Sequence, residues 1–195
     1  MSEGKNDRSL EVRKLDKLTR EELRGLGHDG YVTDSKYKVA KEESQERTVI
    51  RVELVKLKEP FVVEWPEASD DDLERYQRMI SQGFSLGAYE KDKLVGIVIA
   101  EAKSWNNSLW IWDVQVSDKH RRKGIASLFL DRLTVLAKDA GFRIIGLEVQ
   151  NTNVPAISLY RKAGFELDGI DFSYYTNDDL AEDGQVAFFM KKKLV

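Results

Sequence analysis

Residues 114–127 read VQVSDKHRRKGIAS, so a strand-like segment runs through a basic, glycine-bearing loop directly into a long amphipathic helix. The first backbone N–H groups of a helix lack partners within it, and the helix dipole places partial positive charge at the same end. Gly124 and Ala126 leave the backbone open to a ligand, and Arg121, Arg122 and Lys123 add cations. The loop therefore predicts a phosphate site. For this segment alone, a solvated basic turn is the alternative.

A second stretch, residues 147–165, reads LEVQNTNVPAISLYRKAGF. It predicts an apolar strand, a polar turn, and a helix with a proline in its first turn and Gly164 after its end. The two stretches contain the motifs RxxGxA over residues 121–126 and NxxAxxLYxxxGF over residues 153–165. In this order and spacing the motifs resemble the GNAT superfamily of acetyl-CoA-dependent N-acetyltransferases, and the resemblance covers residues 84–193.

The closer resemblance is to the streptothricin acetyltransferases. It rests on Trp105-Asn106, the strand that carries Asp113, LExQxxN over residues 147–153, and GID over residues 169–171. The sequence departs from the pattern at Trp112, where the related enzymes look acidic, and Ala126 stands where many GNAT members have glycine. The resemblance implies an α/β fold with a mixed, mostly antiparallel central sheet, a splayed strand pair and flanking helices.

Composition narrows the class of protein. A chain of 195 residues with 42% hydrophobic residues fits one domain, residues 1–195, of which residues 1–9 are expected to be disordered. Cysteine is absent, and His28 and His120 are too few for a histidine-rich metal site, so we expect no metal. The net charge of −3 disfavours nucleic-acid binding. The longest apolar run, near residues 94–100, is too short to cross a bilayer, so we expect a cytoplasmic protein without membrane association.

Hydrophobic patterning predicts the order of elements. Strands or extended segments are expected over residues 10–15, 31–41, 47–58, 84–90, 94–103, 109–116, 144–150, 165–172 and 185–193. Helices are expected after a capping box at residues 19–22 and over residues 69–80, 122–140 and 154–163. The aspartates at residues 70–72 are interpreted as caps of their helix. Hairpins followed by strands alternating with helices favour a mixed α/β sheet.

Strict alternation predicts two faces for the strand over residues 109–116. One face carries Asp113 and Gln115, and the other carries Trp110, Trp112, Val114 and Val116. A carboxylate in the middle of a strand is unusual for a core position. Asp113 is therefore a candidate for substrate contact or for the general base, and a structural hydrogen bond is the alternative.

The resemblance implies which residues contact acetyl-CoA, the expected cosubstrate. The pyrophosphate is expected at the loop of Arg121, Arg122, Lys123, Gly124, Ile125, Ala126 and Ser127. The backbone of Val114, Gln115 and Val116 is expected to pair with the pantetheine arm, and Asn153 and Tyr160 are further cofactor contacts. Asn153 also suits the cap of its helix.

Acetyl transfer from a thioester to an amine requires that an ammonium lose a proton and that the departing thiolate be stabilised or protonated. Glu148 or Asp113 can serve the amine, and Tyr160 suits the thiolate. Ribosomal-protein N-terminal acetyltransferases share the Leu-Glu-Val strand and the helix tyrosine, so the resemblance implies Glu148 as base and Tyr160 as general acid. The alternatives are a salt bridge at the sheet rim for Glu148 and a buried, hydrogen-bonded tyrosine for Tyr160.

Acidic residues concentrate after the second motif, which favours a cationic acceptor. The expected acceptor contacts are Asp113, Glu148, Asp171 and Tyr174 or Tyr175. The charge run over residues 177–183 is expected to be a solvated loop. The acceptor is then a small primary amine, polyamine-like or streptothricin-like, which implies antibiotic resistance; a homodimer is compatible with this. A protein or peptide N-acetyltransferase and a non-catalytic acetyl-CoA-binding module are the alternatives.

Overall fold

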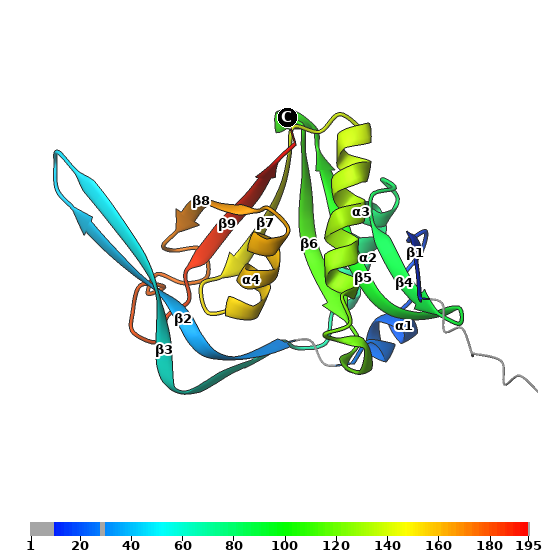
Figure 1. Cartoon of the computed structure of the whole chain (residues 1–195), viewed down its shortest axis with the longest axis horizontal. Coiled ribbons are helices and arrows are strands. Elements are labelled where there is room, and N and C mark those ends of the chain that lie inside the picture. The colour runs from blue at the N-terminus through cyan, green and yellow to red at the C-terminus, as the bar shows by residue number, and fades with distance from the viewer. Residues whose placement is uncertain (1–9, 28–29, 195) are drawn as a thin grey trace, which may run out of the picture. The chain divides into compact units, whose positions relative to one another are not determined.

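The computed structural model describes residues 10–27 and 30–194 (Figure 1). The chain divides into two compact units, Met1–Asp29 with Pro66–Phe142 and Gly30–Trp65 with Arg143–Val195. The segment 1–9, predicted to be disordered, and His28 lie outside the described residues. One domain over the whole chain stays a prediction.

The first unit contains an antiparallel sheet with its strands in the order β1, β4, β5, β6. Its strands are β1 (Leu10–Lys14), β4 (Leu86–Glu90), β5 (Lys93–Lys103) and β6 (Ser108–Val116). Its α-helices are α1 (Arg20–Gly25), α2 (Asp70–Ile80) and α3 (Ile125–Asp139), and two short 3-10 turns are η1 (Ser104–Asn106) and η2 (Asp118–His120). These elements match the predicted order, and the boundary of α3 differs.

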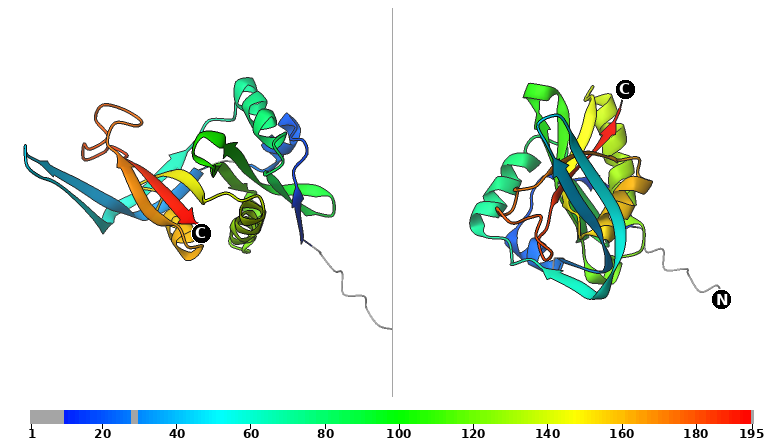
Figure 2. Two further views of the ribbon diagram at one scale, coloured as in Figure 1. Left: turned by 90° about the horizontal axis from the view of Figure 1, so that it is seen from above. Right: turned by 90° about the vertical axis from the view of Figure 1, so that its left-hand side faces the viewer.

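The core of the first unit lies on both faces of its sheet. On one face, Met79 and Ile80 of α2 belong to the same buried cluster as Ile97 and Ile99 of β5. On the other face, a Cβ at Gly96 would lie 3.4 Å from the Phe129 ring of α3. Figure 2 shows the sheet between α2 and α3 in its left-hand view. Burial of these apolar side chains is what holds both helices to the sheet.

Side chains cap the first two helices as the sequence predicts. Thr19 Oγ1 accepts from the backbone N–H of Glu22 at 3.2 Å, and the Glu22 carboxylate accepts from the backbone N–H of Thr19 at 2.8 Å. Ser69 and Asp72 form the same reciprocal pair at the start of α2. Each pair satisfies two backbone groups that a helix end leaves without partners. The interpretation of the α2 aspartates as caps is confirmed for Asp72.

The second unit contains a three-stranded antiparallel sheet and a long hairpin. The strands of the sheet lie in the order β7 (Ile144–Gln150), β9 (Ala187–Lys193) and β8 (Glu166–Asp171). The hairpin pairs β2 (Gly30–Glu43) with β3 (Thr48–Glu64), and the helix of this unit is α4 (Val154–Lys162). Both hairpin strands are longer than predicted, and the end of the hairpin stands clear of the rest of this unit (Figure 1).

Asn151 fixes the hairpin to the second unit. Its Nδ2 donates to Tyr37 O at 2.8 Å, its carbonyl accepts from Tyr37 N–H at 3.0 Å, and its Oδ1 accepts from Val186 N–H at 2.8 Å. The Tyr37 ring also packs against Phe188, with centroids 6.0 Å apart. Asn151 is 4% exposed, so these bonds replace water for a buried amide.

The mixed α/β fold with a mostly antiparallel sheet is confirmed. The splayed strand pair stays a prediction, because its strands β6 and β7 belong to different units. Among the described residues, no helix is both long enough and apolar enough to span a membrane.

Candidate active site

The loop before α3 has a backbone suited to an anion. Gly124 is the N-cap of α3 with φ +85°, and Arg122 also has a positive φ of +63°. Leu128 N–H donates to Gly124 O at 3.0 Å and closes the first helical turn, so the N–H groups of the three preceding residues point out of the helix end. The helix was predicted to begin at residue 122; this is wrong, because the two left-handed residues delay its start to Ile125.

The side chains of this loop have different surroundings. Arg121 Nε lies 3.2 Å from Asp118 Oδ1 and donates to Val116 O at 3.2 Å, so Arg121 is tied to the preceding 3-10 turn. Arg122 and Lys123 are exposed, and Ile125 is buried in the core. Outward-pointing N–H groups beside exposed cations form a donor set that fits a pyrophosphate.

A β-bulge corrects the predicted faces of β6. Ala100 pairs with Ile111 and Ile99 with Asp113, so Trp112 is an extra residue and alternation breaks there. Asp113 Oδ2 accepts from the Tyr76 hydroxyl of α2 at 3.0 Å. The ring of Trp112 lies 5.3 Å from the guanidinium carbon of Arg75, also on α2. Both side chains therefore contact α2, whereas alternation placed them on opposite faces.

Gln115 and its neighbours on β6 make their contacts within the first unit. Gln115 is 5% exposed, and its Nε2 donates to Gly27 O at 3.3 Å. Val114 pairs with Val98 and Val116 with Gly96 across β5. The side chain of Gln115 is thus occupied, and the backbone contacts of these residues with the pantetheine arm stay a prediction.

Glu148 lies among aromatic residues of the second unit. It lies on β7 opposite Phe189 of β9, and its carboxylate accepts a hydrogen bond from the Tyr175 hydroxyl. Burial raises the pKa of the Glu148 carboxyl above its ordinary value, and the bond from Tyr175 offsets part of that rise. A carboxylate with a raised pKa is better matched to a proton acceptor near neutral pH than an exposed one.

Tyrosines surround this carboxylate. The Tyr174 ring packs edge-on against Tyr175 at 5.1 Å and against Phe189 at 5.6 Å. Burial, followed by the hydrogen bond to Glu148, raises the pKa of Tyr175 far above its ordinary value, so its hydroxyl stays protonated and donates. The Tyr31 hydroxyl shares a hydrogen bond with Thr152 Oγ1 at 2.5 Å, and burial and the Glu148 charge both raise its pKa.

The bond between Tyr175 and Glu148 and the position of Tyr31 near Glu148 did not follow from the sequence. Residue 175 lies in a loop and residue 31 in a hairpin, so neither stands at a fixed spacing from Glu148. The Tyr-Tyr pair at residues 174–175 was the one available signal, and it indicated an acceptor contact only.

Asn153 and Tyr160 lie at the two ends of α4. Asn153 Oδ1 accepts from Ala156 N–H at 3.2 Å, which confirms the predicted helix cap. Tyr160 is 8% exposed, and its ring packs against Phe165 with centroids 5.9 Å apart. Their roles toward acetyl-CoA stay predictions.

The acidic loop over residues 177–183 is exposed, as expected, except at Asp179. Asp179 is 2% exposed, and its carboxylate accepts from Tyr175 N–H at 2.9 Å and Thr176 N–H at 2.7 Å. Asp171 Oδ1 accepts from Ser173 N–H at 3.0 Å. Asp179 thus holds the loop that carries Tyr175.

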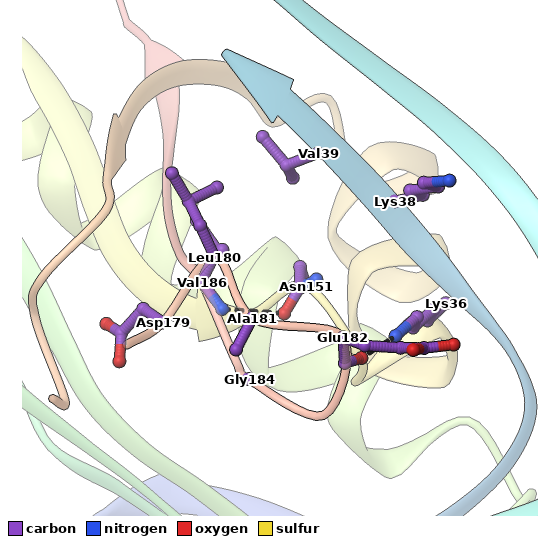
Figure 3. Close-up of a pocket in the computed structure, with 10 residues that line it drawn as sticks. All are labelled: Lys36, Lys38, Val39, Asn151, Asp179, Leu180, Ala181, Glu182, Gly184 and Val186. Atoms are coloured by element: carbon purple, nitrogen blue, oxygen red, sulfur yellow. Dashed lines mark hydrogen bonds between the residues drawn. The ribbon is translucent and has the colours of Figure 1, made fainter. Parts of the chain in front are cut away.

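A pocket of about 430 Å³ lies between this loop and β2 (Figure 3). Lys36 Nζ donates to Glu182 O across it at 2.6 Å, and Asn151, Asp179 and Leu180 also line it. The predicted acceptor residues Asp171 and Tyr174 are not among its lining residues. Within residues 10–27 and 30–194, His, Asp and Glu side chains form no group of three or more that could hold a metal.

The predicted site residues divide between the two units. Asp113 and the loop over residues 121–127 belong to the first, and Glu148, Asn153, Tyr160, Asp171 and Tyr174 belong to the second. The second unit brings Glu148 together with Tyr175 and, through Phe189, with Tyr174.

Comparison with known proteins gives consistent matches. Residues 53–165 match the Acetyltransferase (GNAT) family. The streptothricin acetyltransferase of Streptomyces lavendulae is 35% identical over 97 residues, which is 50% of each chain. That of Escherichia coli is 37% identical over 98 residues, 50% of this chain and 56% of the relative. These alignments span about half the length of the curated relatives. A crystal structure of nourseothricin acetyltransferase, 26% identical, covers 95% of this chain and 99% of its own with a TM-score of 0.73.

Proposed function

The chain belongs to the acetyltransferase (GNAT) family, and from this we propose that it transfers the acetyl group of acetyl-CoA to a primary amine of a small cationic acceptor. The observation that carries the proposal beyond family membership is Glu148. Its carboxylate is partly buried, its pKa is raised by that burial, and a tyrosine hydroxyl donates to it. Such a group can take the proton that an ammonium must lose before it attacks a thioester.

In this proposal each region has one task. Acetyl-CoA supplies the acetyl thioester, and the loop over residues 121–127 holds its pyrophosphate through outward-pointing N–H groups and exposed cations. Glu148 takes the proton of the amine, directly or through water. Tyr160 donates a proton or a hydrogen bond to the departing thiolate. Asp113 competes with Glu148 for the role of base, and each carboxylate accepts from a tyrosine hydroxyl, that of Tyr76 for Asp113 and that of Tyr175 for Glu148.

We propose a streptothricin-like compound as the acceptor, which would make the protein an antibiotic-resistance enzyme. The support is similarity to the Streptomyces lavendulae and Escherichia coli enzymes and to nourseothricin acetyltransferase. Asp171, Tyr174 and Glu148 in the second unit offer carboxylates and ring faces, which suit ammonium groups.

A peptide or protein α-amine is the second candidate acceptor. It is favoured by the surroundings of Trp112 in the first unit. The Arg75 guanidinium carbon and Lys103 Nζ lie 5.3 and 5.2 Å from the Trp112 ring. The Glu101 carboxylate pairs with Lys103 at 2.5 Å and accepts from Trp112 Nε1 at 2.6 Å, so one carboxylate stands against two cations here. Such surroundings are less suited to a polycationic antibiotic than an acidic surface would be.

Purified protein with acetyl-CoA and a panel of amines tests the proposal, with released CoA thiol as the readout. The panel contains streptothricin, simple polyamines and short peptides with free N-termini. We expect turnover with streptothricin and protection of a sensitive host that expresses the chain. Turnover with peptides alone would establish the second candidate, and no turnover with any amine would leave a non-catalytic acetyl-CoA-binding module.

A further inference from the structure

Three residues of the second unit form a chain of hydrogen bonds that ends at the proposed base. The buried Asp179 carboxylate accepts from the backbone N–H groups of Tyr175 and Thr176 at 2.9 and 2.7 Å, and from Thr176 Oγ1 at 2.7 Å. Tyr175, held at its backbone in this way, directs its hydroxyl to Glu148. A single acidic side chain in the loop therefore holds the backbone from which the Tyr175 side chain extends.

We propose that Tyr175 is a positioning residue that orients the Glu148 carboxylate and stabilises its ionised form, and that Asp179 holds Tyr175 in place for this task. The proposal rests on the proposed function, since it concerns the base of that reaction. It assigns a purpose to an acidic loop that otherwise reads as solvated surface.

The bond to Tyr175 acts against burial. Burial favours the protonated carboxylic acid, which cannot accept a proton from an ammonium, whereas a donor to the carboxylate favours the ionised form. A hydrogen bond to a charged group is also among the stronger side-chain bonds. It fixes one carboxylate oxygen and leaves the other free of that bond, so the group is held in one orientation.

Two further tyrosines, Tyr31 and Tyr174, interact with the charge of Glu148, and the charge of Asp171 also acts on Tyr174. Tyr174 comes from the same loop as Tyr175, Tyr31 comes from β2, and β9 contributes the apolar Phe189. The pKa of Tyr31 and that of Tyr174 are both raised, by burial first, so these hydroxyls stay neutral over the working pH range. Tyr175 is thus the neighbour whose removal should change the ionisation of Glu148.

The test compares Tyr175→Phe with Tyr31→Phe, a matched control that removes a buried hydroxyl whose partner is Thr152. Protein with ¹³C-labelled glutamate carboxyls is titrated by NMR, and the Glu148 signal is assigned with Glu148→Gln. The pH profile of kcat/KM is measured on the same variants. The titration needs no substrate, so it stays informative even if the proposed acceptor is wrong.

In Tyr175→Phe we expect a higher Glu148 pKa and an acid limb of kcat/KM that moves upward with it. At pH values below the Glu148 pKa, kcat/KM of Tyr175→Phe should be roughly tenfold lower than that of the wild type, because removing one donor to a carboxylate is worth on the order of one pKa unit. At higher pH the two values should converge. Asp179→Asn should move both quantities in the same direction by less. An unchanged Glu148 titration in Tyr175→Phe would overturn the proposal, and so would an equal shift in Tyr31→Phe. Loss of rate at every pH without movement of the limb would reduce Tyr175 to a structural role.

Discussion

The loop over residues 121–127 and the surroundings of Glu148 are built in opposite ways. Consecutive residues form the loop, which is basic, is exposed except at Ile125 and Ala126, and depends on the backbone conformation at Gly124. The Glu148 surroundings are partly buried and aromatic, and they come from β2, β7, β9 and the loop after β8. We infer that the loop binds acetyl-CoA and that Glu148 takes the proton of the amine. Substitutions in the loop should then lower the affinity for acetyl-CoA, and substitutions at Glu148 should lower kcat.

The largest expected effect is in acetyl-CoA binding. Gly124→Glu should abolish it, because a left-handed φ of +85° is unfavourable for any side chain and a carboxylate there repels phosphate. Gly141→Glu is the matched control: it lies after the other end of α3, with φ +76° and open space around it. Calorimetry should show wild-type affinity for the control. Undiminished binding by Gly124→Glu would remove the phosphate assignment.

Glu148→Gln should instead reduce kcat by about 10²- to 10⁴-fold, the range typical of a lost general base. Acetyl-CoA affinity should be unchanged, because the loop is intact. Glu166→Gln, an exposed substitution on β8, provides the control. Steady-state kinetics beside calorimetry separates the two quantities, and a parallel loss of affinity in Glu148→Gln would break the division of tasks.

Tyr160→Phe should lower kcat toward the smaller end of the same range, about 10²-fold, with little change in the KM for acetyl-CoA. The hydroxyl acts chiefly when the thiolate departs, and water can replace it in part. Tyr37→Phe, another buried tyrosine of the second unit, controls for loss of a ring hydroxyl. Wild-type kcat in Tyr160→Phe, with chemistry rate-limiting, would leave Tyr160 as a core residue.

Asp113→Asn is expected to have the smallest effect, less than about tenfold in kcat. Asparagine keeps an oxygen that can accept from the Tyr76 hydroxyl, so the contact between β6 and α2 persists. A loss as large as that of Glu148→Gln would make Asp113 the base and reverse the assignment.

The same contrast explains how much could be read from the sequence. The loop, the order of elements and the helix caps depend on neighbouring residues, so patterning predicted them to within a few residues. The bulge at Trp112 and the left-handed residues before α3 were missed, because strict alternation and helical periodicity carry no sign of them. The contacts of Tyr175 and Asp179 were missed for a different reason: they follow from tertiary folding of a loop, which has no fixed spacing from Glu148.

The pH profile of kcat/KM for wild type and Glu148→Gln, at saturating acetyl-CoA, tests the central claim most directly. Glu148 must be ionised to accept a proton, and burial raises its pKa above the ordinary 4.5. The kcat/KM of the wild type should therefore rise with pH through that raised pKa. The kcat/KM of Glu148→Gln should be much lower and should not show this rise. A Glu148→Gln enzyme that keeps both the wild-type rate and the acid limb would contradict the assignment of Glu148 as the base.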